Sequence, residues 1–202
     1  MSKRIITISR EFGAGGHTLG ADLARAMGIA FYDQEIIDSA VAETGFSPEF
    51  VRDAGEYASS SHSFLFHLAM SHGMTSGGAM ELSNYDKIYI AQARTIQEMA
   101  NKSPCVIVGR CADYILRDRD DVFNVFVRAN DEYRKQRILE HYGPVEGKSI
   151  SERLQEKDKK RMLYYRHYTD REWGNIKNYH LVIDASVIPL DMAVRWIMEA
   201  VR

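Results

Sequence analysis

The sequence predicts an α/β fold of three layers, built around a five-stranded parallel sheet. Five short apolar runs have the composition of strands that are buried on both faces. Helix-like segments separate these runs along the chain, as the crossovers of a parallel sheet require. A glycine-rich turn joins the first run to the first helix. Together these observations favour a parallel sheet with helices on both sides.

Length and composition agree with one ordinary globular domain, and we expect residues 1–202 to form it. The chain has a mass of 23.1 kDa, with 45% apolar and 27% charged residues. These values exclude a disordered chain, a collagen and a disulfide-stapled miniprotein. The net charge is −2 and the isoelectric point is near 6.4. No global basic field therefore favours nucleic acid or an anionic membrane as a partner.

The sequence leads us to expect a cytoplasmic protein. Cys105 and Cys111 are too few for a disulfide framework, and buried thiols in a reducing compartment are the plainer interpretation. No apolar signal-peptide core follows the first basic residues. No apolar stretch approaches the roughly 20 residues that span a bilayer.

The first part of the chain alternates strands and helices. Residues 4–8 are β-branched and nearly all apolar, which predicts a buried strand. Apolar residues then recur at helical spacing until Gly28, which is suited to end that helix. Residues 29–32 predict a second strand, and a helix follows it to Gly45.

Strand signals disappear over residues 46–84. Pro48 follows a serine, as in the first turn of a helix. The stretch over residues 59–78 mixes Ser, Gly, Met and His, which indicates short helices joined by loops. We predict a helical insertion here, followed by a regular helix over residues 85–99.

The second half of the chain returns to the alternating pattern. Residues 105–108 and 122–127 are the third and fourth predicted strands, and Asn130 is suited to cap the next helix. A long polar helix is expected over about residues 150–165. Residues 180–184 are the fifth predicted strand, and a final amphipathic helix closes the chain.

The turn after the first strand contains Gly13, Gly15 and Gly16. Glycine lets backbone N–H groups converge on an anion, and the following helix adds partial positive charge at its N-terminus. A tight connection without a ligand is the plainer alternative. The place of the turn, at the carboxyl end of the first strand, favours phosphate binding.

Two phosphate-loop patterns fit this turn only in part. The pattern G-x-x-x-x-G-K-[ST] has Glu11 at its first glycine and His17 at its lysine. The dinucleotide pattern G-x-G-x-x-G can start at Gly13 but has Thr18 at its third glycine. Asp33 could imitate the acid that binds ribose. An NAD-dependent oxidoreductase is therefore one alternative.

A resemblance to a known family rests on several short motifs. They are ISREFGAGGHTLG over residues 8–20, FYD over 31–33, VGR over 108–110, YY over 164–165 with WG over 173–174, and YHLVID over 179–184. Together they resemble the cytidylate kinase-like family, P-loop proteins related to nucleoside monophosphate kinases. The resemblance implies a P-loop NTPase-like fold. It also implies phosphoryl transfer from ATP, with Mg²⁺, to a small phosphorylated acceptor such as CMP.

The resemblance implies that six consecutive residues bind the phosphates of ATP. They are Gly13, Ala14, Gly15, Gly16, His17 and Thr18. The Thr18 hydroxyl would help to hold Mg²⁺. Against a cytidylate kinase, however, Gly16 stands where a phosphate-reaching lysine is expected. That lysine offsets charge on the transferred oxygens, so another cation must replace it or activity is weak or lost. Arg10 is the nearest candidate and His17 the second.

The resemblance also implies residues for the acceptor. Arg110 would bind the acceptor and assist the transfer, with Asp33 and Asp113 in the same pocket. Asp33 is also suited to cap the next helix, and Arg110 could simply form a salt bridge at the end of its strand. The acceptor pocket would lie on the side of the predicted insertion, residues 46–84.

Residues 150–175 are expected to form a basic lid over the phosphates, from which Arg161 and Arg166 would reach them. Six Lys and Arg residues stand against three Asp and Glu residues between Lys157 and Glu172. A solvated charged helix is the alternative for this segment. The tyrosines nearby would either stack on a base or pack the segment onto the core.

The sequence thus predicts an ATP-dependent kinase that acts on small-molecule nucleotides, as a monomer or a homodimer. Arg10, Arg110, Arg161 and Arg166 are its candidate catalytic residues. A catalytically impaired protein that still binds nucleotides or other anions is the main alternative, because the expected lysine is missing at Gly16.

Overall fold

The computed structural model describes residues 4–54, 82–144 and 146–202. Residues 55–81 of the predicted insertion lie outside this description. In chain order the elements are β1 (Ile5–Arg10), α1 (Gly16–Met27), β2 (Ala30–Tyr32), α2 (Gln34–Thr44), α3 (Pro48–Ala54), α5 (Asn84–Lys102), β3 (Cys105–Val108), α6 (Ala112–Ile115), β4 (Val122–Arg128), α7 (Asp131–Tyr142), α8 (Ile150–Thr169), the 3-10 turn η1 (Ile176–Asn178), β5 (Leu181–Asp184) and α9 (Leu190–Ala200).

The five strands form one sheet in the order β2-β3-β1-β4-β5, and every pairing is parallel. Strand β1 lies at the centre, with Ile5 opposite both Cys105 of β3 and Val122 of β4. The predicted fold class is confirmed. Dinucleotide-binding sheets have the order 3-2-1-4-5-6, in which β1 is next to β2. The observed order separates these two strands, so this sheet does not have the dinucleotide-binding order.

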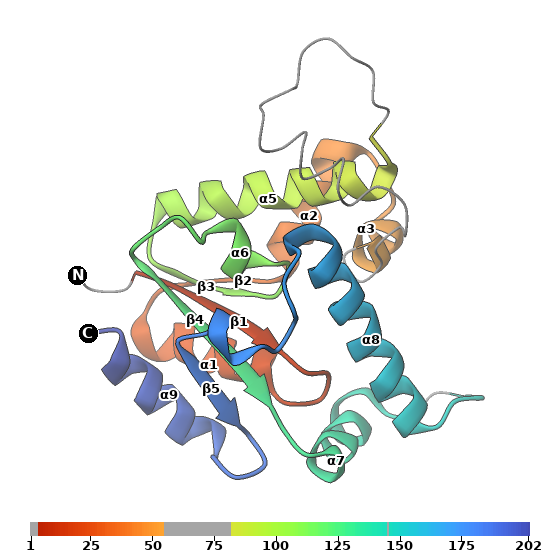
Figure 1. Ribbon diagram of the computed structural model, residues 1–202, viewed down its shortest axis with the longest axis vertical. Helices are drawn as coiled ribbons and strands as arrows, with labels where there is room; N and C mark the ends of the chain where they lie inside the picture. The colour runs from red at the N-terminus through yellow and green to blue at the C-terminus, as the bar shows by residue number, and fades with distance from the viewer. Residues whose placement is uncertain (1–3, 55–81, 145) are drawn as a thin grey trace.

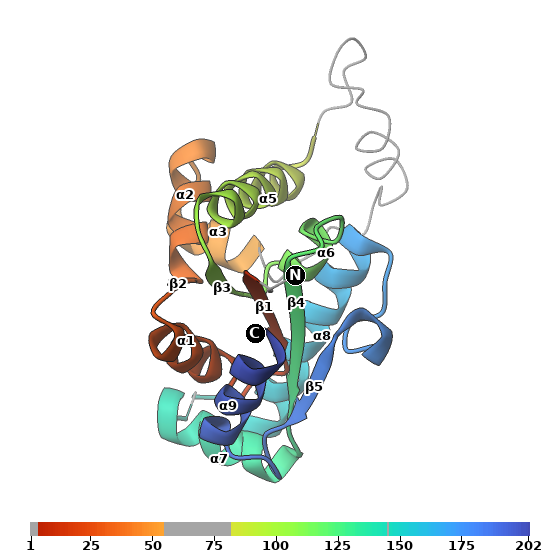
Figure 2. The ribbon, with the colours of Figure 1, turned by 90° about the vertical axis from the view of Figure 1, so that its left-hand side faces the viewer.

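Helices cover both faces of the sheet, which makes three layers (Figures 1 and 2). Ile6 and Ile8 of β1 face the layer of α1 and α9, where they join a buried cluster. Ile5 faces the opposite layer, and its cluster includes residues of α5, α6 and α8. Successive side chains of a strand point to opposite faces. The continuous apolar run of β1 is therefore required by burial on both sides.

The predicted strands agree with the structure to within two residues, but three helices differ, of which α5 ends at Lys102 and not at residue 99. Helix α8 continues four residues beyond the expected end to Thr169, because Tyr164, Tyr165 and Tyr168 pack it against the rest of the protein. Helix α6 was not predicted, since four residues carry no helical periodicity. No helix in the described ranges is long and apolar enough to cross a bilayer.

Candidate active site

The glycine-rich turn connects the carboxyl end of β1 to the N-terminus of α1. Gly13 and Gly15 have φ angles of 80° and 89°, a left-handed conformation that glycine adopts without steric cost. No side chain of the described residues caps α1, whose N-cap is Gly15. The first N–H groups of the helix therefore remain for an anion. Ala14 differs from its neighbours because its side chain is fully buried in the core, so only its backbone faces the loop.

Two helices brace the glycine-rich turn, residues 11–18, which we call the phosphate loop. Asp158 of α8 accepts a hydrogen bond of 2.8 Å from the backbone N–H of Phe12. Arg134 of α7 donates to the Phe12 carbonyl at 2.8 Å and also pairs with Asp158. Arg134 is only 5% exposed, and an unpaired charge at such a depth would be costly. Glu11 accepts from the backbone N–H of Ala129 at 3.0 Å, and burial raises its pKa.

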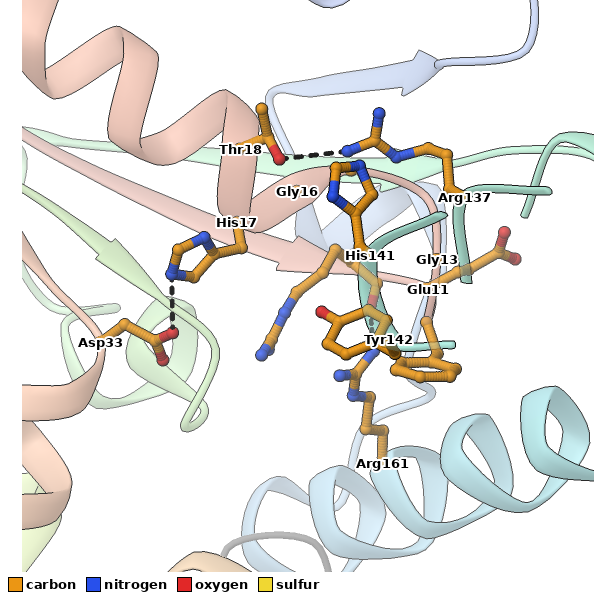
Figure 3. Close-up of a pocket in the computed structure, with 13 residues that line it drawn as sticks. Glu11, Gly13, Gly16, His17, Thr18, Asp33, Arg137, His141, Tyr142 and Arg161 are labelled. Carbon is orange, nitrogen blue, oxygen red and sulfur yellow. Dashed lines mark hydrogen bonds and ion pairs between the residues drawn. The ribbon is translucent and has the colours of Figure 1, made fainter. Parts of the chain in front are cut away.

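The loop borders a pocket of about 250 Å³ (Figure 3). The predicted residues Arg10, His17, Thr18, Asp33 and Arg161 line it together with the loop glycines. The complete lining is Arg10, Glu11, Phe12, Gly13, Gly15, Gly16, His17, Thr18, Asp33, Arg137, His141, Tyr142 and Arg161. The structure thus brings together residues from the loop, Asp33 at the start of α2, and residues of two helices more than 100 positions further along the chain.

Arg137 of α7 is a site residue that the sequence analysis missed. Its Nη2 donates a hydrogen bond of 3.1 Å to the hydroxyl of Thr18, as Figure 3 shows. A Cβ added at Gly15 would lie 3.4 Å from Nε of Arg137. The guanidinium therefore lies beside the phosphate loop. His141 and Tyr142 follow on the same helix, and the helical spacing of residues 137 and 141 was the one signal that could have indicated this face.

Arg10 fills the space beside Gly16. A Cβ added at position 16 would lie 2.5 Å from Cβ and 2.8 Å from Cγ of Arg10. A Cβ added at Gly109, where φ is 75°, would overlap Nη1 of the same arginine. The side chain of Arg10 thus extends from Gly16 to Gly109. It leaves no room for a lysine at position 16 unless Arg10 moves.

Arg161 lies next to Arg10. Its Nη1 donates to the carbonyl oxygen of Arg10 at 3.2 Å, and its guanidinium lies 5.7 Å from the ring centre of Phe12. Arg166 is exposed and lines neither this pocket nor the next one. Five residues correspond to about 500° of helical rotation. The two predicted lid cations therefore lie on different faces of α8.

A second, smaller pocket of about 50 Å³ contains Arg110. Arg10 and Arg161 line both pockets, so these two cations stand between them. Arg110 has a φ of 56°, an uncommon conformation for a residue with a side chain. Its Nη1 is buried and has no hydrogen-bond partner among the described residues. The salt bridge considered for Arg110 is not formed in the described part of the chain.

The two predicted carboxylates have different surroundings. Asp33 occupies the N-cap position of α2, but its side chain makes no capping bond. Its Oδ2 instead lies 3.4 Å from Nε2 of His17. Asp113 does not line either pocket; it is buried on α6 and accepts a hydrogen bond of 2.6 Å from the Tyr165 hydroxyl. Asp113 is therefore not part of the lining of the Arg110 pocket, but it contacts Tyr165, which is.

The tyrosines of α8 pack this helix onto the protein. Tyr168 stacks on Tyr89 of α5 with ring centres 3.9 Å apart, and Tyr164 donates to Gln92 at 3.4 Å. Burial raises the pKa of each of these tyrosines. The packing interpretation holds for all three, and Tyr164 also borders the smaller pocket, as Tyr165 does. Helix α8 therefore has one face in the core and another, with Arg161, at the site.

This arrangement agrees with a comparison of sequence families. Residues 5–187 match the profile of the cytidylate kinase-like family. The chain belongs to this family. The match includes the phosphate loop, Arg110 and all five strands. Among curated proteins, none matches the chain.

Solved structures with the same fold include kinases. An uncharacterized protein from Eubacterium ventriosum ATCC 27560 is 26% identical, with a TM-score of 0.69 over 98% of this chain and 97% of that one. A gluconokinase from Sinorhizobium meliloti 1021 is 16% identical, with a TM-score of 0.55 over 98% and 91% of the two chains. A shikimate kinase from Acinetobacter baumannii is 14% identical, with a TM-score of 0.52 over 98% and 92%. This member of the cytidylate kinase-like family therefore has the fold of P-loop kinases.

Family and fold together indicate a kinase of a nucleotide or another small molecule. The site contains no group of three His, Cys, Asp or Glu side chains that could hold a metal by themselves, and none occurs elsewhere in the described ranges. Mg²⁺ commonly binds through substrate phosphates and one or two protein oxygens. The described residues of this site fit that mode of binding and not a dedicated metal cage.

Proposed function

We propose that the protein is an ATP-dependent nucleoside monophosphate kinase and that CMP is its first candidate acceptor. The observation that carries this proposal is the position of Arg10 and Arg161, which line both the phosphate-loop pocket and the Arg110 pocket. A phosphoryl group that passes from one pocket to the other must pass these cations. Such transfer depends mainly on positioning and on charge stabilisation.

The phosphate-loop pocket would bind the donor. Backbone N–H groups of residues 13–18 would surround the phosphates of ATP, and the N-terminus of α1 would add partial positive charge. Arg137 already donates to Thr18 and can turn to a phosphate oxygen. In that position it would leave the Thr18 hydroxyl to Mg²⁺, which offsets phosphate charge when bound.

Arg10 would take the role of the missing lysine. The side chain lies beside Gly16, the position where the lysine of a cytidylate kinase is expected, so the positive charge is supplied from the end of β1 instead of from α1. Arg161 would add a second charge from α8. This replacement argues against the alternative of a catalytically impaired protein, because the site retains cations between donor and acceptor.

Arg110 would bind the acceptor phosphate. Its buried Nη1 lacks a partner among the described residues, and a buried donor without a partner costs free energy that an anion would recover. A guanidinium also matches phosphate oxygens in a bidentate geometry. The pocket of about 50 Å³ suits a phosphate group, so the nucleoside would extend out of it.

A hydroxyl acceptor is the second candidate, and the His17–Asp33 pair favours it. A hydroxyl must lose a proton during transfer, whereas an ionised phosphate need not. Asp33 and His17 line the phosphate-loop pocket and could take that proton together. The shikimate kinase and the gluconokinase of similar fold are named for acceptors that contain hydroxyl groups.

A coupled assay distinguishes these functions. Release of ADP is measured with ATP and Mg²⁺ in the presence of CMP, dCMP, UMP, AMP, shikimate or gluconate. Turnover with CMP and not with the hydroxyl acceptors supports the proposal. Turnover with a hydroxyl acceptor alone supports the second candidate. A folded protein whose melting temperature rises with ATP, yet which turns over none of the six, is the catalytically impaired form.

We also propose a cytoplasmic location and a monomer or homodimer. Both cysteines are free and buried, which suits a reducing compartment. Cell fractionation tests the location, and sedimentation velocity tests the oligomeric state.

A further inference from the structure

A third pocket lies away from the proposed active site. It has a volume of about 410 Å³ and shares no lining residue with the other two pockets. Its walls come from the first residues of β4, from α6 and the segment that follows it, and from residues beside α8 and β5. The lining residues are Asp113, Leu116, Arg117, Arg119, Asp120, Val122, Asn124, Arg171 and His180. Strand β4 separates this pocket from the phosphate loop, which contacts Ala129 beyond the other end of that strand.

Three of the residues around this pocket are arginines, and they differ in how their charge is balanced. Arg119 forms two hydrogen bonds of 2.9 Å to the carboxylate of Asp121, so its charge is already neutralised. In the described ranges the one ion pair of Arg117 is a 3.7 Å contact with Asp118, whose side chain is 85% exposed, and Nη1 of Arg117 donates to the Tyr114 carbonyl at 2.8 Å. Such a surface pair contributes little. Arg171 forms no close ion pair in the described ranges, but at longer range its charge acts on the buried carboxylate of Asp113 and opposes the effect of burial on the pKa of that group.

Arg117 and Arg171 are held against the same ring. Their guanidinium carbons lie 4.1 Å and 5.1 Å from the ring centre of Tyr114. Two like charges therefore contact one ring at the edge of one pocket, and Asp113, which also lines the pocket, lies within electrostatic range of Arg171. An anion that contacts both guanidinium groups would offset their like charge. Paired guanidinium groups match the oxygens of a phosphate especially well.

Asp113 connects this pocket to the Arg110 pocket. It lines the third pocket and is 2% exposed, and its Oδ1 has no hydrogen-bond partner among the described residues. Its other oxygen accepts from the hydroxyl of Tyr165, which lines the smaller pocket together with Arg110 and Trp173. A ligand beside Asp113 would thus be one hydrogen bond away from a residue of the proposed acceptor site.

We propose that Arg117 and Arg171 bind a small organic phosphate in this third pocket and that its binding is transmitted to the Arg110 pocket through Asp113 and Tyr165. The volume exceeds what a free phosphate ion needs and is in the range of pockets for small organic ligands. Binding at this site does not depend on the proposed kinase function, because no residue of the donor or acceptor pockets contacts the ligand.

Calorimetry with ribose 5-phosphate as the probe tests the binding. Three proteins are compared, the wild type, R117Q/R171Q and the matched control R25Q/R195Q, which removes two exposed arginines elsewhere. We expect R117Q/R171Q to bind the probe about tenfold more weakly than the other two. Equal affinity in all three overturns the proposal. If the double variant does not fold, R171Q alone is compared with R195Q.

Inorganic phosphate serves as a second probe and tests whether the organic part is recognised. Weaker binding of phosphate than of ribose 5-phosphate supports an organic ligand, and equal affinity of the two overturns that part of the proposal.

Fluorescence tests the transmission of binding from the third pocket to the Arg110 pocket. In W196F, Trp173 is the remaining tryptophan and borders the Arg110 pocket. Its emission should change on addition of ribose 5-phosphate, and the change should be lost in W196F/Y165F. A constant emission while the probe binds overturns the transmission.

Discussion

Gly16 and Arg10 are mutually dependent, because a Cβ at position 16 would lie 2.5 Å from Cβ of Arg10. The Cβ atom of Arg10 is bonded to the backbone, so rotation of the side chain cannot move it away from position 16. The observed position of Arg10 therefore requires glycine at position 16. The absence of a lysine there follows from the packing of β1 against α1. The relationship allows the proposed replacement of the lysine to be tested directly.

We expect G16A to lower the free energy of unfolding by at least about 1 kcal/mol, because the overlap outweighs the better helix propensity of alanine. Urea denaturation measures this change. In the R10G background, where the opposing Cβ is absent, the same substitution should be neutral or stabilising. G16K alone should not increase kinase activity. An equal cost of G16A in both backgrounds would show that the two positions are independent.

Loss of the Arg10 charge should impair transfer and leave the fold intact. R10M keeps Cβ and Cγ beside Gly16 and removes the guanidinium. We expect kcat to fall by about 10²-fold to 10³-fold, as for the removal of other groups that stabilise transition-state charge. R25M, which removes an exposed arginine of α1, is the matched control and should retain full activity. A kcat for R10M near that of R25M contradicts the assigned role.

Arg137 should contribute to donor binding. R137M removes the guanidinium beside Thr18, and we expect the Kd for ATP to rise about tenfold through loss of a charge-assisted contact. K135M, on the same helix and outside the pocket, should bind ATP as the wild type does. Titration calorimetry gives both constants. The prediction is wrong if the two variants bind ATP equally.

The brace of Asp158 should stabilise the phosphate loop. D158N retains an oxygen for the Phe12 N–H and removes the charge that faces Arg134. Because Arg134 is nearly buried, we expect a loss of about 2 kcal/mol in the free energy of unfolding. D191N breaks an exposed pair with Arg195 and should change stability very little. Comparable losses in the two variants would show that burial of the pair is unimportant.

Asp113 should make stability depend on pH. Burial raises its pKa from 3.8 to about 6, against the opposing hydrogen bond from Tyr165. The folded protein then holds this proton more tightly than the unfolded chain, so the contribution is complete below about pH 4 and is lost as the pH rises through 6. D113N cannot ionise. It should exceed the wild type by up to about 3 kcal/mol at pH 8 and differ little at pH 4. Denaturation at both pH values measures this, and a constant difference contradicts it.

Much of the fold could be predicted because its signals are local. The strands are buried on both faces, so each appears as an apolar run without help from its neighbours, and Gly28 and Asn130 mark helix ends by their own geometry. The short helix α6 could not be predicted in this way. It begins after Arg110 and Cys111, which both have positive φ without being glycine. Only the surrounding structure imposes that conformation.

The candidate site was predictable where it follows the chain and not where it depends on packing between distant elements. Gly13, Gly15 and Thr18 follow β1 closely along the chain, so the sequence by itself determined the phosphate loop. Only the tertiary structure decided which cations surround the loop. It brought Arg137 and Arg161 to it and turned Arg166 away, since each residue's direction depends on how α7 and α8 pack and not on its neighbours in the sequence.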